Sequence, residues 1–123
     1  MKLRILKNAV RLRVNKTELD QFLSGHPVIE TVEFPNASLQ YALMPTPESE
    51  MKVSFNANRL AIHLPMAWGK EWEKEDKVGF DAVQEFNGKT MNILVEKDFK
   101  CLSPERTEDE SDNFEHPTIG HNC

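Results

Sequence analysis

Cysteine is scarce in this sequence. The chain of 123 residues has two cysteines, Cys101 and Cys123, and both lie near its C-terminal end. No long apolar run follows Met1, so we expect neither a signal peptide nor a transmembrane helix, and hence no membrane contact. Such a chain is expected in the cytoplasm, where the two thiols stay reduced and do not form a disulfide.

Catalytic motifs are absent as well. The sequence contains no nucleophile elbow, phosphate-binding loop, dinucleotide-binding glycine pattern or zinc-protease helix motif, which disfavours an enzyme and implies no cofactor. One enzymatic alternative stays open, because Glu33 and Glu85 occupy equivalent places in the repeat described below. Two facing carboxylates can act as an acid/base pair, although solvent-facing strand positions are the simpler interpretation.

Charge is distributed unevenly along the chain. The net charge is -5, and it belongs to the segment from Cys101 onward, where Arg106 is the single base. The acids of that segment are Glu105, Glu108, Asp109, Glu110, Asp112 and Glu115. At the other end, the bases Lys2, Arg4, Lys7, Arg11, Arg13 and Lys16 all precede the first acid, Glu18. A basic front and an acidic end predict two different contacts, or one end folding onto the other.

The apolar pattern of the first half recurs in the second. "MKLRILKNAVRLRVN" matches "MKVSFNANRLAIHLP" at an offset of 50 residues, with Phe22 opposite Trp72 and Val28 opposite Val78. After a shift of two residues, Glu33 and Phe34 recur as Glu85 and Phe86. We interpret this as an internal repeat, with repeat one at 1–44, repeat two at 51–97 and the polar join "PTPESE" at 45–50.

Each repeat has the pattern strand, strand, helix, strand, strand. Alternating apolar residues predict strands over 2–6, 10–14, 28–34 and 39–44, and again over 52–57, 59–64, 77–83 and 90–96. Helices are predicted over 15–25, where Asn15 and Glu18 form a capping box, and over 66–76. The expected core is Leu3, Ile5, Val10, Leu12, Val14, Leu19, Phe22, Val28 and Phe34, with Val53, Phe55, Leu60, Ile62, Leu64, Trp72, Val78 and Phe86.

These patterns predict an α+β fold that is mostly β. Two tandem β-β-α-β-β repeats would form one pseudo-two-fold, barrel-like domain over residues 1–100. Residues 101–123 would form an acidic C-terminal tail in which apolar content is low, as in flexible segments. Because one chain would supply both repeats, we expect a monomer or a homodimer.

A resemblance supports this plan. The stretch "LKNAVRLRVNKTELDQFL" resembles the MazE-type pattern of turn, alternating strand and helix, and "NRLAIHLPMAW" with "EDKVGF" resembles the AbrB pattern. The resemblance implies a swapped-hairpin barrel and a DNA-binding regulator. Lys7 replaces the family glycine, and Ala61 and His63 stand where the first repeat has Arg11 and Arg13. The whole chain, including "VEKDFKCLSP", also resembles a small family of uncharacterised bacterial proteins.

Two non-catalytic functions follow from the charge split. Lys2, Arg4, Lys7, Asn8, Arg11 and Arg13 would line neighbouring strands and contact DNA, unless the arginines pair with Glu30 or Glu33 across the sheet. The tail would bind a protein partner through Glu108, Asp109, Glu110, Asp112, Phe114 and Ile119, as the MazE resemblance implies. A solubilising tail, or one folded back onto the basic first strand, is the alternative.

Metal binding is a third interpretation of the C-terminal segment. Cys101, His116, His121 and Cys123 are zinc-ligand residue types, and the histidine spacing is suitable. No closely spaced cysteine pair is present, which favours incidental residues. His63 is interpreted as a surface or satisfied sheet residue.

Overall fold

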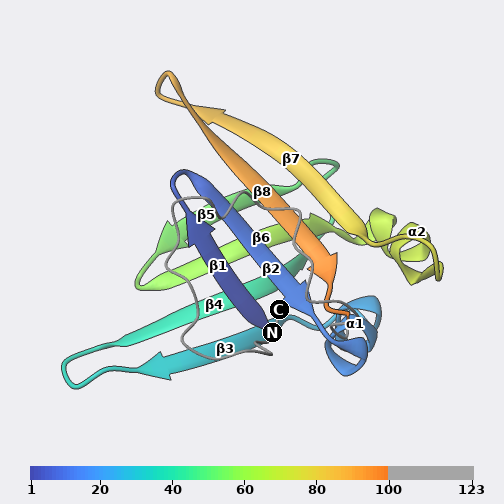
Figure 1. Cartoon of the computed structure of the whole chain (residues 1–123), viewed down its shortest axis with the longest axis horizontal. Coiled ribbons are helices and arrows are strands. Elements are labelled where there is room, and N and C mark those ends of the chain that lie inside the picture. Colours follow the sequence, from blue (N-terminus) through green and yellow to red (C-terminus); the bar gives the residue numbers. More distant parts are fainter. Residues whose placement is uncertain (100–123) are drawn as a thin grey trace, which may run out of the picture.

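The protein consists of two four-stranded sheets with two short helices at one end. The computed structural model describes residues 1–99. The first half contains β1 (Lys2–Leu6), β2 (Ala9–Val14), α1 (Lys16–Leu23), β3 (Val28–Glu33) and β4 (Ser38–Thr46). The second half contains β5 (Lys52–Asn56), β6 (Arg59–Pro65), the 3-10 turn η1 (Met66–Trp68), α2 (Gly69–Glu73), β7 (Gly79–Phe86) and β8 (Lys89–Lys97). Figure 1 shows their arrangement.

Each sheet combines strands from both halves of the chain. The strand orders are β1-β2-β8-β7 and β3-β4-β6-β5. Hairpins pair antiparallel, whereas the two central pairs, β2 with β8 and β4 with β6, are parallel. If β1 to β4 are exchanged with β5 to β8, strand for strand, the first order becomes the second, read in the opposite direction. Neither half therefore forms a sheet by itself.

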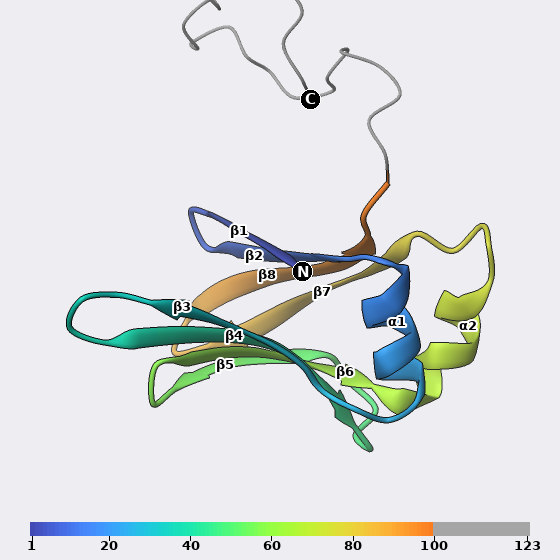
Figure 2. The ribbon, with the colours of Figure 1, turned by 90° about the horizontal axis from the view of Figure 1, so that it is seen from below.

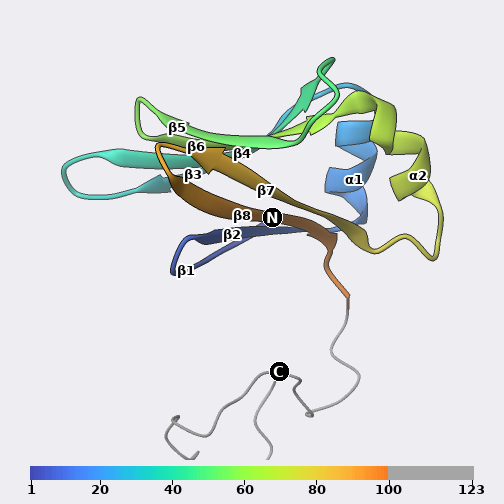
Figure 3. The same ribbon diagram turned by 90° about the horizontal axis from the view of Figure 1, so that it is seen from above.

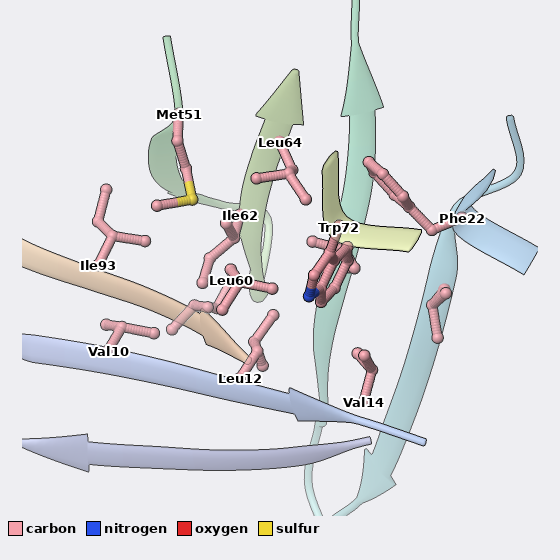
Figure 4. Close-up of a cluster of buried hydrophobic side chains, with 13 residues drawn as sticks. Val10, Leu12, Val14, Phe22, Met51, Leu60, Ile62, Leu64, Trp72 and Ile93 are labelled. Carbon is pink, nitrogen blue, oxygen red and sulfur yellow. The ribbon is translucent and has the colours of Figure 1, made fainter. Parts of the chain in front are cut away.

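The core lies between the sheets and under the helices. Leu12, Ile62, Leu64 and Ile93 are fully buried side chains that point into this space (Figure 4). Trp72 of α2 fills the helix end of the core, and its ring packs edge-on against Phe22 of α1 at a centroid distance of 5.8 Å. Burial of these side chains is the main source of stability.

Local signals place the start of the first helix as the sequence predicts, and glycine and asparagine take the turn positions. Asn15 caps α1: its side chain accepts the Glu18 N–H, and the Glu18 carboxylate accepts the Asn15 N–H, at 2.9 Å in both cases. Gly25 follows the helix with a φ of 87°. The β7–β8 turn places Asn87 and Gly88 at positive φ, as two-residue hairpin turns require.

Some of the expected core is wrong. Ile5, Phe34, Phe55, Val78 and Phe86 are exposed rather than buried. Val78 is wrong because it precedes β7, in which Phe80 is the residue that pairs with the buried Val95. The other four have the expected phase but lie on or just after the edge strands β1, β3, β5 and β7, near the hairpin turns.

The second helix is shorter than expected. The segment 66–76 forms a 3-10 turn followed by an α-helix of five residues rather than one continuous helix. Pro65 ends β6 and immediately precedes the turn. Within residues 1–99, no helix is long and apolar enough to cross a membrane.

Candidate binding surfaces

Four basic side chains form two neighbouring cross-strand pairs on the outer side of β1 and β2. The register pairs Lys2 with Arg13 and Arg4 with Arg11. The residues between them, such as Leu12, are buried, so the four bases point to the opposite, outer side. We call these four residues the basic strand face. The sequence correctly predicts that they lie together.

Acids at the end of β8 and directly after it pair with part of this face. The Arg11 Nε lies 2.5 Å from the Glu96 Oε1, and the Lys2 Nζ lies 2.8 Å from the Asp98 Oδ2. The expected partners were Glu30 and Glu33, which lie on the other sheet. The prediction missed Glu96 because β2 and β8 are 80 residues apart in the chain and become neighbours only through the parallel pairing.

The turn between β1 and β2 is tied to the neighbouring hairpin. Lys7 is exposed with a φ of 53°, a conformation that favours glycine. The Asn8 side chain donates to the Thr90 carbonyl, and the Asn92 N–H donates to the Asn8 carbonyl at 3.0 Å. Asn8 therefore holds the turn in place on β8 and uses a side-chain N–H in that contact.

Exposed apolar side chains gather at the end of the molecule opposite the helices. All four hairpin turns lie there, as Figures 2 and 3 show from opposite sides. Near these turns, Ile5 is 58% exposed, Phe34 53% and Phe55 63%, and Val32 and Phe86 are also exposed. We call these five residues the hairpin-end surface. Isolated exposed apolar residues are ordinary, whereas here five come from all four hairpins.

These side chains belong to the inner faces of the sheets. Cross-strand partners point to the same side, and Ile5 pairs with Val10 while Phe55 pairs with Leu60. Both partners are buried, at 3% and 9% exposure. Burial is therefore lost from the central strand of each hairpin, β2 or β6, to its edge strand, β1 or β5. Each large apolar side chain that a partner covers here would contribute about 1.5–3 kcal/mol.

The two glutamates of the enzymatic alternative are not brought into one site. Glu33 ends β3 and accepts a 3.3 Å hydrogen bond from the Ser38 hydroxyl. Glu85 lies on β7, in the other sheet. Both are exposed to solvent, and no facing pair of carboxylates forms.

A serine and a histidine meet on the outer side of the second sheet. The Ser54 Oγ lies 2.9 Å from the His63 Nε2. The strand register places Lys52, not an acid, opposite His63. His63 is thus a sheet residue with a hydrogen-bond partner, as the sequence predicts, and among residues 1–99 no third group orients it as a catalytic base.

The edges of the two sheets meet at β5 and β7. The Gln84 side-chain carbonyl accepts the backbone N–H of Val53 at 2.7 Å and so links the two edge strands. Beside this link lies an open cavity of about 360 Å³, lined by Met51, Trp68 and Ala82 among others. No sequence pattern indicates this cavity, because its walls come from separate elements.

Two carboxylates surround the first residue. The Met1 ammonium contacts Glu18 at 2.5 Å and Glu30 at 3.5 Å. The Tyr41 hydroxyl donates to the Met1 carbonyl at 3.1 Å. Partial burial, and then the nearby charges of Glu30 and Glu18, raise the pKa of Tyr41 above its ordinary value of 10.0.

The residues predicted for metal and partner binding in the C-terminal segment lie outside the described residues. They are Cys101, His116, His121 and Cys123, and Glu108, Asp109, Glu110, Asp112, Phe114 and Ile119. Between residues 1 and 99, no three histidine, cysteine or acidic side chains are grouped as metal ligands are.

Fold and surfaces define a small, mostly β protein with one basic strand face and one apolar end. The family model that matches the chain covers residues 1–118, so the protein belongs to the family of unknown function DUF7009. The matched region extends beyond the sheets and includes the acidic cluster. No curated protein and no solved structure matched the chain.

Proposed function

We propose that the two halves are a tandem repeat that forms a pseudo-two-fold, swapped-hairpin barrel. The strand orders support this, because exchanging β1 to β4 with β5 to β8 converts one sheet into the other. So does the register: Val10 pairs with Ile93 as Leu60 pairs with Tyr41, which corresponds to offsets of 50 and 52. One chain would then bury what AbrB/MazE-like relatives bury by dimerisation.

We further propose that the protein is a non-enzymatic binding protein whose hairpin-end surface receives an apolar segment of another protein. The observation that carries this is the exposure of Ile5, Phe34 and Phe55 near the turns of three separate hairpins. No folding reason accounts for it, because exposed residues at these positions could be polar without loss of core packing.

The charges at the turns define the partner further. Lys7, Arg59 and Lys89 lie at or beside three of the four turns. A segment that inserts apolar side chains among the hairpins would place its flanking residues close to these bases. We therefore propose a partner in which aromatic or aliphatic residues are flanked by Asp or Glu, because complementary charges speed association and fix orientation.

Selection from a random peptide library on the full-length chain tests this function. We expect the selected peptides to combine large apolar residues with acids. In the double variant Ile5→Thr/Phe55→Thr their affinity should fall at least tenfold, since about 1.4 kcal/mol corresponds to a factor of ten. Threonine suits strands, so both substitutions preserve the hairpins.

Val83→Thr is the matched control. Val83 is 62% exposed, close to the value for Phe55, but it pairs with Asn92 on the outer side of the first sheet. Its substitution should change peptide affinity less than twofold. Equal losses in both variants, or selected peptides without apolar residues, would refute the proposal.

A second candidate function is DNA contact through the basic strand face. Two neighbouring strands present four bases in register, which suits contacts to phosphates. Arg4→Gln/Arg13→Gln should weaken retention of a DNA duplex and reduce its dependence on salt. Screening is weak at about 20 mM salt, since the Debye length is already about 10 Å at 0.1 M. If the unaltered chain does not retain DNA under that condition, this candidate fails.

A further inference from the structure

The basic strand face has more bases than the acids beside it neutralise. Glu96 and Asp98 each pair with one base, Arg11 and Lys2. Arg13 forms no ion pair within residues 1–99, and Lys7 adds another exposed base at the end of the same hairpin. Excess positive charge along two strands attracts a flexible or extended acidic segment.

We propose that the acidic segment 105–115 of the same chain lies along the basic strand face. This segment carries six acids, Glu105, Glu108, Asp109, Glu110, Asp112 and Glu115, against the single base Arg106. The family match extends to residue 118 and so includes all six. The inference does not depend on the function proposed for the hairpin-end surface, which lies at the turns and on the inner faces.

The path of the chain supports this occupant. Phe99 lines a cavity of about 180 Å³ together with Arg11 and Arg13, so the described chain ends beside the basic strand face. β2 has six residues and spans about 20 Å at 3.3 Å per residue. Glu105 and Glu115 lie six and sixteen residues beyond Phe99, within about 20 and 53 Å of it in an extended chain. After one reversal the acids can therefore follow β2 toward its start.

Other bases of the molecule are less suitable for this segment. Lys70, Lys74 and Lys77 surround α2, but Glu71, Glu73, Glu75 and Asp76 lie among them and outnumber them. The corresponding outer positions of the β5–β6 hairpin hold Lys52, Ser54, Ala61 and His63, which pair with one another in the register. The β1–β2 hairpin thus has the higher density of positive charge.

Zero-length carbodiimide crosslinking of the full-length chain tests the contact. This reagent joins a lysine amine to a carboxylate that touches it. We expect amide links from Lys2 or Lys7 to acids between 105 and 115, with the yield falling severalfold from 20 to 500 mM salt because exposed ion pairs are screened. The Lys2–Asp98 pair provides an internal positive control, and Lys70 with Lys74 provide the comparison sites.

A second measurement does not depend on lysine chemistry. In the full-length variant Glu108→Gln/Asp109→Asn/Glu110→Gln/Asp112→Asn, amide NMR shifts of residues 2–4 and 11–13 should change. Those of the equivalent residues 52–54 and 61–63 should not. Links that favour α2 lysines, shift changes equal in both hairpins, or links joining isotopically distinct copies would each overturn the proposal.

Discussion

Replacement of Trp72 by alanine tests the account of the core most directly. Trp72 is fully buried, and its ring packs edge-on against Phe22 at 5.8 Å and Phe80 at 5.9 Å. Removing a buried tryptophan typically costs 3–5 kcal/mol, and these ring contacts favour the upper part of that range. The indole N–H also donates to the Val78 carbonyl at 3.1 Å. That carbonyl keeps a partner in the variant, since the Lys97 N–H donates to it at 2.9 Å.

We therefore expect Trp72→Ala to reduce the free energy of unfolding by about 4 kcal/mol, a large part of the 5–15 kcal/mol typical of small domains. Urea unfolding followed by far-UV circular dichroism measures this value. Trp72→Phe should cost less than half as much, because a phenyl ring keeps part of the aromatic packing. Trp68→Ala is the control: Trp68 contacts Phe80 but is partly exposed. A cost for Trp72→Ala below about 1.5 kcal/mol, or below that of Trp68→Ala, would show that α2 does not close the core.

Three further predictions concern single positions. A Cβ at Gly79 would lie 2.0 Å from the Val95 carbonyl oxygen, so Gly79→Ala should destabilise the fold more than Gly88→Ala does. A Cβ at Gly88 meets no atom within 4 Å, and that variant loses about 1–2 kcal/mol because of the positive φ at this position. Urea unfolding compares the two variants, and equal losses would contradict the close approach of β7 to β8. Asn15→Ala should cost about 1 kcal/mol by removing the α1 cap, whereas Asn15→Asp should cost much less; thermal unfolding distinguishes them. Tyr41 is the single tyrosine, so absorbance at 295 nm reports its ionisation directly, with a midpoint above 10 that Glu30→Gln lowers. As pH rises above 10, the Tyr41 hydroxyl ionises in the unfolded chain before it does in the folded protein, so the free energy of unfolding falls. A free energy of unfolding that stays constant over this range would contradict the raised pKa.

The order of the elements was predictable because its signals are local. Alternating side chains mark strands such as β2, and the Asn15–Glu18 capping box marks the start of α1. The match between the two halves also places Phe22 and Trp72 correctly, since both are fully buried. Such signals depend on a few neighbouring residues and remain valid whatever the rest of the chain does.

Exposure near the turns was not predictable in the same way. Ile5 and Val10 have the same strand pattern and face the same side, yet one is exposed and the other buried. The difference is that β1 is an edge strand, whereas β2 lies between β1 and β8, and that strand order joins residues from both halves. Four of the five residues of the hairpin-end surface, Ile5, Phe34, Phe55 and Phe86, are therefore interpreted as core from the sequence.

The basic strand face shows both kinds of information. The sequence places Arg11 and Arg13 on one side of a strand and predicts Lys2 and Arg4 beside them. It cannot identify Glu96 as the partner of Arg11, because that contact requires β8 to lie parallel to β2. Electrostatic neutralisation depends on distances of a few ångströms, which only the tertiary structure determines.

The sequence by itself determined the strands, the capped first helix, the turns and the separation of charge between the two ends of the chain. These follow from backbone preferences and side-chain periodicity within short segments. The tertiary structure decided which strands become neighbours, which apolar residues stay uncovered and which charges are paired. The physical reason is that burial and Coulomb energy depend on distances between residues far apart in the chain. Those distances are fixed only when hairpins from both halves combine in each sheet.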